Sequence, residues 1–344
     1  MRGRSKSSYR YLTILGVALL FSGCNGRNWI NSNSAMYTEE NMNYFGTEKE
    51  QIDTLKEVEI KSSYADIEII ASDDYYIEYQ YYYIDNEPVL TLEGGKLYFD
   101  DSNMNEGAYS ISLSKGCYFK IYVPNTAEFN NVSIQTASGE ISLGSFVTEE
   151  LEVENSYGDV VISRVDSKES TVILNSGKLT MENSTLDNIS IENSYGDVVL
   201  STINYSNNEM DKSLLMEGDI SIKMSSGNIK LKDISVESLS ADNSYGDFIG
   251  DGLFTKEVNA ELSSGNIEVN DSYVDKLDIQ SSYGDIDLSL CAKEEEYRMN
   301  ITSLYGDTRI GEEEYQGSVL IDKGGEKEIK IDASSGNIEI RFKE

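Results

Sequence analysis

From about residue 56 onwards, the chain consists of short stretches in which apolar and polar residues alternate. The stretches come in pairs around a glycine: two apolar residues lie seven and five positions before it, and two lie two and four positions after it. Around Gly158 these are Leu151, Val153, Val160 and Ile162. Alternation with a period of two is typical of a half-buried β strand. Each unit therefore predicts a strand, a glycine corner, a second strand and a connector, with about four inward side chains.

The corner glycine returns at a fixed interval. The glycines are Gly139, Gly158, Gly177, Gly196, Gly227, Gly246, Gly265, Gly284, Gly306 and Gly336, and six of the nine intervals are 19 residues. A period of this length is typical of a stacked repeat protein, in which each strand pairs with its neighbour ~4.8 Å away and the stack buries a face that one repeat cannot. The sequence thus predicts an all-β chain that forms a right-handed β-helix, or β-solenoid, of 19-residue repeats.

The corners are of two kinds. One kind has Tyr before the glycine and Asp after it: Tyr157/Asp159, Tyr195/Asp197, Tyr245/Asp247, Tyr283/Asp285 and Tyr305/Asp307. The other kind has Ser before the glycine: Ser138, Ser176, Ser226, Ser264 and Ser335. The two kinds alternate from Gly139 to Gly284, so we expect two repeats per coil with the Tyr corners stacked on one edge; a coil of one 19-residue repeat is the alternative. Gly284 and Gly306 are both of the Tyr kind, which predicts an irregularity within residues 289–335.

The N-terminus has the pattern of a lipoprotein signal peptide over residues 1–23. A basic segment precedes an apolar stretch, residues 11–21, that is too short to span a membrane comfortably. The Ser-Gly-Cys sequence that ends at Cys24 resembles a bacterial lipobox, in which the Cys carries the lipid; an ordinary secretory signal is the alternative. Both interpretations predict an extracytoplasmic protein, and the first predicts a lipid-anchored one on the cell membrane, exposed at the surface. Residues 24–50 are polar and aperiodic, which predicts a flexible tether.

Residues 51–344 are predicted to form one β-solenoid domain, with an irregular part and cap over 51–135 and regular repeats over 136–344. The first repeat of the Tyr kind is centred on Ala65, which replaces the glycine. The stretches 76–84 and 89–99 predict a hairpin, and its many tyrosines are expected to cover the N-terminal end of the solenoid. A cap is needed there because an open coil exposes unpaired strand edges.

The S-x-G-[DN]-[IV] corners, together with the Ile-Tyr-Val-Pro sequence at 121–124, resemble the bacterial "putative adhesin" family of repeat domains of unknown function. The resemblance covers roughly residues 50–344. It implies a β-helix-like fold on the cell surface and carries no active site with it.

The chain is strongly acidic, with a formal net charge of −33. Loss of residues 1–23 removes four basic residues and no acidic ones, which changes the charge to −37. Such acidity opposes binding to nucleic acid and to anionic lipid, so that a lipid anchor must provide the membrane contact. Solubility is the simpler explanation of the acidity, and calcium bound by the stacked Asp residues of the Tyr corners is the alternative, although no known calcium loop occurs. Glu294–Glu296 and Glu312–Glu314 are expected to be solvated loops rather than ligands.

The chain has no histidine, which excludes catalysis by Ser-His-Asp or Cys-His groups and all histidine-ligated metal sites. Carboxylate-pair hydrolysis stays open because acidic residues are abundant. Cys117 and Cys291 could pair, but we expect two free thiols.

We therefore predict a non-catalytic, adhesin-like surface lipoprotein that binds or scaffolds in the bacterial envelope and has no cofactor unless calcium is bound. The Tyr and Asp residues of the corners could form a ladder that holds a glycan or a surface protein, or the tyrosines could simply cover the coil edge. The alternatives are an envelope-stress or regulatory lipoprotein that acts through a membrane partner, and a carbohydrate-active enzyme that uses acidic residues.

Overall fold

The computed structural model describes residues 36–104, 110–111, 116–204 and 218–343, so the predicted signal peptide and Cys24 lie outside the described residues. The N-terminal part contains β1 (Met36–Tyr37), η1 (Glu39–Asn41), β2 (Asn43–Gln51), β3 (Glu57–Ser62), β4 (Ala65–Ser72), β5 (Tyr76–Tyr83), β6 (Val89–Glu93), β7 (Lys96–Asp100), β8 (Ser110–Ile111) and β9 (Cys117–Pro124). The repeats contain β10 (Glu128–Thr136), β11 (Ile141–Tyr157), β12 (Val160–Ser176), β13 (Leu179–Tyr195), β14 (Val198–Ile203), β15 (Asp219–Ser226), β16 (Ile229–Tyr245), β17 (Phe248–Ser264), β18 (Ile267–Ser281) and β19 (Ile286–Leu290). The C-terminal part contains η2 (Glu294–Glu296), β20 (Tyr297–Ile310), β21 (Glu313–Asp322), β22 (Lys327–Ser335) and β23 (Ile338–Phe342).

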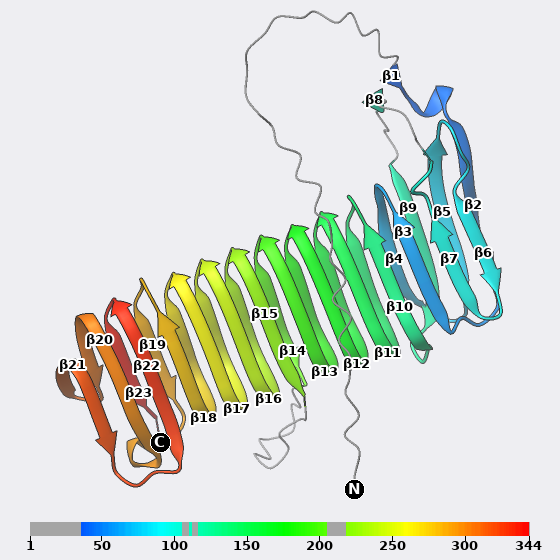
Figure 1. Ribbon diagram of the computed structural model, residues 1–344. Helices are drawn as coiled ribbons and strands as arrows, with labels where there is room; N and C mark the ends of the chain where they lie inside the picture. Colours follow the sequence, from blue (N-terminus) through cyan, green and yellow to red (C-terminus); the bar gives the residue numbers. More distant parts are fainter. Residues whose placement is uncertain (1–35, 105–109, 112–115, 205–217, 344) are drawn as a thin grey trace, which may run out of the picture. The chain divides into compact units, whose positions relative to one another are not determined.

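The repeats form a stack of parallel strands, which confirms the predicted β-solenoid (Figure 1). The register fixes the coil length: Ile141 of β11 pairs with Val160 of β12, and Val160 pairs with Leu179 of β13. Each repeat therefore pairs directly with the next repeat, 19 residues further along. The expected coil of two repeats is wrong, because one 19-residue repeat completes one coil.

Each coil buries more side chains than the four that the pattern predicts. Seven positions of β11 are buried, namely Ile141, Leu143, Phe146, Thr148, Leu151, Val153 and Asn155. The alternation changes phase at residues 144–145 and again at 149–150, where two outward positions follow each other. At the first of these points the chain turns through a left-handed residue, Ser145 with φ 63°, and the same turn recurs at Arg164, Asn183, Asp233 and Asp271. The predicted connector is thus itself a strand that bends and adds to the core.

The C-terminal repeat is inserted into the stack out of chain order. Strand β22 lies between β18 and β20, and β23 lies between β19 and β20. The corner at Gly336 consequently separates the corners at Gly284 and Gly306 in space. The predicted irregularity in residues 289–335 is this insertion, and it restores the alternation of Tyr and Ser corners that the chain order breaks.

The N-terminal end is capped by antiparallel strands. Strand β5 pairs with β2 on one side and with β9 on the other, and the buried rings of Tyr81, Phe99 and Phe119 pack together beneath them. The expected aromatic cap is thereby confirmed. Two expectations are wrong: residues 43–50 belong to β2 rather than to a tether, and β6 pairs with β7 rather than with β5.

Both described thiols are free. Cys117 is buried in β9, and Cys291 is partly buried just after β19. No helix in the described ranges has the length and hydropathy needed to cross a membrane.

Candidate functional site

The corner glycines of successive coils lie directly on top of one another. At Gly177 the backbone φ is +139°, and a Cβ built there would lie 2.0 Å from the carbonyl oxygen of Gly158 in the preceding coil. The Gly177 N–H donates to the carbonyl of Tyr195 in the following coil at 3.0 Å. Glycine is therefore required at this position for two reasons, the left-handed backbone and the close approach of the coils.

Buried asparagines support the Tyr corners from inside. The Asn155 Nδ2 donates to the carbonyl oxygens of Gly158, at 3.1 Å, and of Gly139 in the preceding coil, at 3.0 Å. Asn193 makes the same pair of bonds to Gly196 and Gly177. One buried asparagine thus donates to the carbonyls of two corners and links neighbouring coils.

The residue after each glycine forms a second ladder along the same edge. The Asp197 Oδ1 accepts a hydrogen bond from the Asn228 backbone N–H at 2.8 Å, and the Asn228 Oδ1 in turn accepts from the Asp247 N–H at 3.0 Å. The pattern continues through Asn266 and Asp285. Asp159, Asp197, Asp247 and Asp285 each use one carboxylate oxygen for a neighbouring coil in this way.

Asp307 differs from the other four predicted aspartates because its coil ends the row of corners. Its backbone N–H donates to the Asn337 Oδ1 at 3.1 Å, as the Asp285 N–H does toward Asn266. On its other side Asp307 pairs with Gln316 of β21, which runs antiparallel and is not a repeat coil. Its exposed carboxylate thus has no following corner whose backbone N–H it could accept from. Asp307 therefore ends the row of corner aspartates, and the other four are the ones whose carboxylates bond to the next coil.

The tyrosines of the corners point into the solvent. The exposed fractions are 64% for Tyr157, 63% for Tyr195, 65% for Tyr245, 65% for Tyr283 and 76% for Tyr305. The register places a serine between each consecutive pair, because Tyr157 pairs with Ser176 and Ser176 pairs with Tyr195. Consecutive tyrosines are therefore separated by two strand spacings, or ~9.6 Å. We call these five residues the tyrosine ladder.

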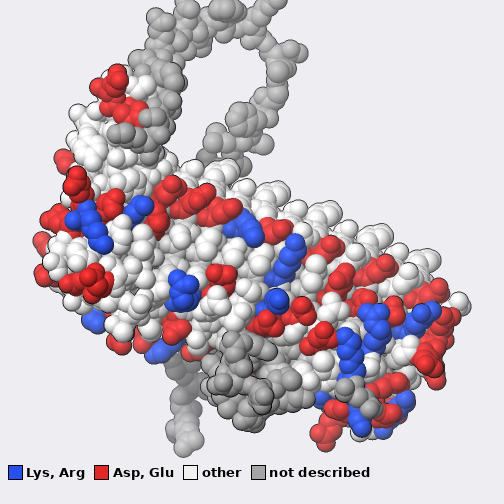
Figure 2. Space-filling model, turned by 180° about the vertical axis from the view of Figure 1, so that it is seen from behind, with Lys and Arg blue, Asp and Glu red and all other residues white. Residues whose placement is uncertain are grey.

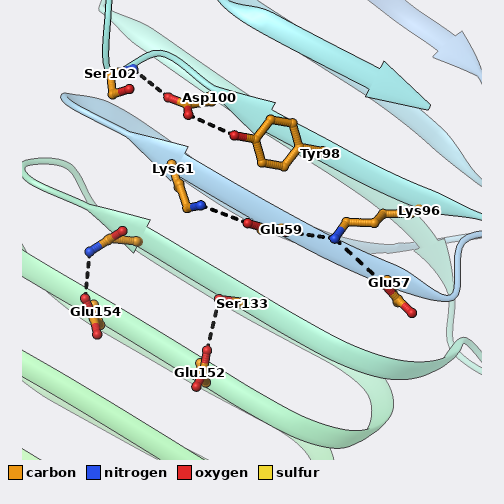
Figure 3. A network of polar contacts seen from close by, with 11 residues as sticks. Glu57, Glu59, Lys61, Lys96, Tyr98, Asp100, Ser102, Ser133, Glu152 and Glu154 are labelled. Atoms are coloured by element: carbon orange, nitrogen blue, oxygen red, sulfur yellow. Dashed lines mark hydrogen bonds and ion pairs between the residues drawn. The ribbon is translucent and has the colours of Figure 1, made fainter. Parts of the chain in front are cut away.

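The tyrosine ladder runs along one edge of an acidic molecule, with the aspartates of the Tyr corners beside it. The long strands end at this edge (Figure 1), and on the side seen in Figure 2 a row of uncharged side chains lies along it, above the charged side chains of the coil face. Many of the charges on the coil faces are paired. In Figure 3, Glu59 lies between Lys61 at 2.9 Å and Lys96 at 2.8 Å, and hydrogen bonds from both lysines lower the pKa of Glu59.

The structure thus places all five predicted tyrosines on one edge, with the aspartates beside them. In the described part of the chain, no cluster of three or more Cys, Asp or Glu side chains is placed to hold a metal ion. Burial raises the pKa of Asp101, but this carboxylate accepts hydrogen bonds from Ser62 Oγ and the Ser63 N–H inside the cap and faces no solvent.

Sequence reasoning missed the asparagines. A signal was present, because Asn155, Asn193 and Asn243 all stand three residues before the glycine of a Tyr corner. The other two Tyr corners have Ser281 and Ser303 at this position. The equivalent position is apolar in four of the five Ser corners, as at Leu174 and Leu262, and is Thr136 in the first.

The model of the family described as Toastrack DUF4097 matches residues 55–249 and 218–341 of this chain. Among solved structures, a putative adhesin from Bacteroides fragilis is 9% identical, with 88% of this chain and 99% of that chain covered and a TM-score of 0.39. A putative lipid binding protein from Parabacteroides distasonis is 14% identical, with 90% and 100% covered and a TM-score of 0.35. A putative cell adhesion protein from Clostridium sporogenes is 10% identical, with 88% and 100% covered and a TM-score of 0.21. A search of curated proteins matched nothing.

Proposed function

This chain belongs to the Toastrack DUF4097 family, and from that premise we propose that it is a non-catalytic binding module on the outside of a bacterial cell. The tyrosine ladder is the observation that carries the proposal. Large aromatic side chains are normally buried, and rows of exposed ones are typical of surfaces that bind a partner. Here five tyrosines stand at equivalent positions and each is more than 60% exposed.

The fold supports this function because it makes the surface rigid. Each ladder tyrosine lies on a coil that is flanked by serine-corner coils or ends the stack, and the close glycine contacts hold the backbone of its corner. A buried asparagine adds a hydrogen bond to the corner stack at Tyr157, Tyr195 and Tyr245. A preformed surface loses little conformational entropy when it binds. The five side chains therefore form a linear contact surface that needs no rearrangement.

The position of the protein in the cell is a further part of the proposal. Cys24 carries the lipid and anchors the protein to the cell membrane, as the basic segment, the short apolar stretch and the lipobox-like sequence suggest. The acidic chain, with a formal net charge of −37 after loss of residues 1–23, keeps the domain from adsorbing to anionic headgroups. The ladder then faces partners in the envelope or on a neighbouring surface.

The experiment is a pull-down with the full-length protein in detergent, with calcium and with a chelator. The baits are isolated peptidoglycan, envelope glycans, extracellular-matrix proteins and solubilised membrane proteins. A double variant, Tyr195→Ala with Tyr245→Ala, removes two central rings of the ladder, and Leu320→Ala on β21 is the control because Leu320 is 78% exposed outside the ladder.

Saturable binding that the double variant loses and Leu320→Ala keeps is the expected result. Binding that the double variant retains would show that the tyrosine ladder is not the contact surface. Loss of binding in chelator alone would make calcium part of the site. Capture of a membrane protein alone would favour a regulatory lipoprotein, and release of sugars from a bait would replace the proposal with an enzyme.

A further inference from the structure

The spacing of the tyrosine ladder suggests one class of ligand. We propose that the ladder binds an extended, β-1,4-linked glycan chain, with one disaccharide for each tyrosine. The inference rests on the proposed function, since it names the partner of the same surface.

The repeat distance is the first argument. Because a serine corner lies between consecutive tyrosines, the rings repeat every two coils rather than every coil. In a β-1,4-linked chain of hexopyranoses each sugar is turned over relative to the last, so the same ring face recurs once per disaccharide. That repeat is on the order of 10 Å, close to two strand spacings of ~4.8 Å. A glycan of this kind can therefore place equivalent sugar faces on every tyrosine, whereas coiled α-linked chains cannot.

The regularity of the ladder is the second argument. The exposed fractions of Tyr157, Tyr195, Tyr245 and Tyr283 agree within 63–65%, so the four side chains are presented alike. The fifth, Tyr305, continues the row because the C-terminal repeat is inserted between its coil and that of Tyr283. Without this insertion the two tyrosines would lie on adjacent coils and the period would break at that point.

The chemistry of the edge is the third argument. The apolar face of a pyranose packs on an aromatic ring, while its hydroxyl groups need hydrogen-bonding neighbours, and the ladder has serines between the tyrosines and carboxylates after them. The acidic coil faces repel polyuronic acids and other anionic chains. A neutral chain of hexoses or N-acetylhexosamines satisfies both conditions.

The test uses the full-length protein with cellohexaose and chitohexaose as neutral β-1,4-linked probes and maltohexaose as the α-linked control, with titration calorimetry as the readout. The decisive variant exchanges a tyrosine and a serine on neighbouring coils, Tyr245→Ser with Ser226→Tyr. It keeps the number of tyrosines but changes their separation. The tyrosine introduced at position 226 would lie one strand spacing from Tyr195 and three from Tyr283, in place of the regular two. Far-UV circular dichroism and the melting temperature verify that each variant is folded.

We expect affinity for a β-1,4-linked hexamer to exceed that for maltohexaose, and Tyr195→Ala to lower it about tenfold, the size of one aromatic contact. The exchange variant should lose as much affinity as the Tyr245→Ser single change or more. Equal affinity for maltohexaose, unchanged affinity in the exchange variant, or no binding to either β-1,4 probe would overturn the inference. If ladder-dependent capture of a protein or of phosphatidylcholine vesicles persisted in that case, the proposed binding function would stand with a different partner.

Discussion

Substitution of Gly177 by alanine tests whether the close stacking of the corners allows only glycine at this position. The left-handed φ of +139° costs an alanine roughly 1–2 kcal/mol. The new Cβ would also lie 2.0 Å from the Gly158 carbonyl oxygen, which belongs to backbone and cannot rotate away. Forcing the two coils apart adds about 1–3 kcal/mol, as other overpacked sites do. We expect Gly177→Ala to lower the free energy of unfolding by about 2–5 kcal/mol.

Two other glycines separate the contributions. Gly94 has a φ of +62° and nothing within 4 Å of a built Cβ, so Gly94→Ala measures the backbone strain alone, about 1 kcal/mol. Gly144 has no left-handed φ and its nearest contact is 3.4 Å away, so Gly144→Ala should change stability by less than about 1 kcal/mol. Urea unfolding followed by circular dichroism gives the three values, with the m-value as a check for partial unfolding of the stack. A loss for Gly177→Ala no larger than that for Gly94→Ala would refute the stacking argument.

Other contacts lead to four further predictions. Asn155→Leu should destabilise the protein by about 2–4 kcal/mol in urea unfolding, because two corner carbonyls lose the donor that this buried side chain provides; a loss under about 1 kcal/mol would show that other donors replace it. Glu59→Gln should cost about 0.5–1 kcal/mol near neutral pH. The lowered pKa of Glu59 means that its contribution is present above the unfolded pKa and disappears as pH falls through the folded pKa, so a difference that persists in strong acid would contradict the assignment. Burial raises the pKa of Cys117 to about 11, so thiol reagents at mildly alkaline pH should modify Cys291 and leave Cys117 intact until the protein unfolds. Deletion of residues 337–344 removes β23, and hydrogen exchange should then show lost protection in β20 but not in β12; equal protection in both would contradict the inserted order.

The sequence predicts the features that depend on local chemistry. Alternating apolar positions and corner glycines identify the strands and the solenoid, since each inward residue is set by the pleat of its own strand. The Gly94–Gly95 pair is a sequence signal for a tight hairpin turn. Its left-handed backbone makes the turn between β6 and β7, so that β5 pairs with other strands. Strand β2 gives no alternating pattern because its residues are exposed or half-buried, and this explains why it resembles a tether.

The coil length and the strand order depend on pairing between distant residues. An alternation of Tyr and Ser corners agrees equally well with one repeat per coil and with two, and only the register of β11 with β12 decides between them. The insertion of β22 between β18 and β20 is similarly non-local, and so is the pairing with β21 that sets Asp307 apart from the other corner aspartates. For the candidate site, the sequence identifies the tyrosines and aspartates, but their spacing follows from the register and so becomes known only from the structure.

Over the coils from Gly139 to Gly246, the alternation has a physical origin in the buried asparagines; the later Tyr corners have Ser281 and Ser303 at the same position. Asn155 and Asn193 each satisfy the glycine carbonyls of their own coil and of the coil before it, so a polar side chain is needed only in every second coil. The intervening coil can then place an apolar residue such as Leu174 at the same position and bury it. The exposed residue before the glycine has the same two-coil period: tyrosine follows each asparagine by two positions, and serine follows each apolar residue by two positions. The inserted C-terminal repeat keeps this period, because its Ala333 and Ser335 lie between two Tyr corners. Spatial neighbours rather than chain order therefore determine which kind of corner a coil has.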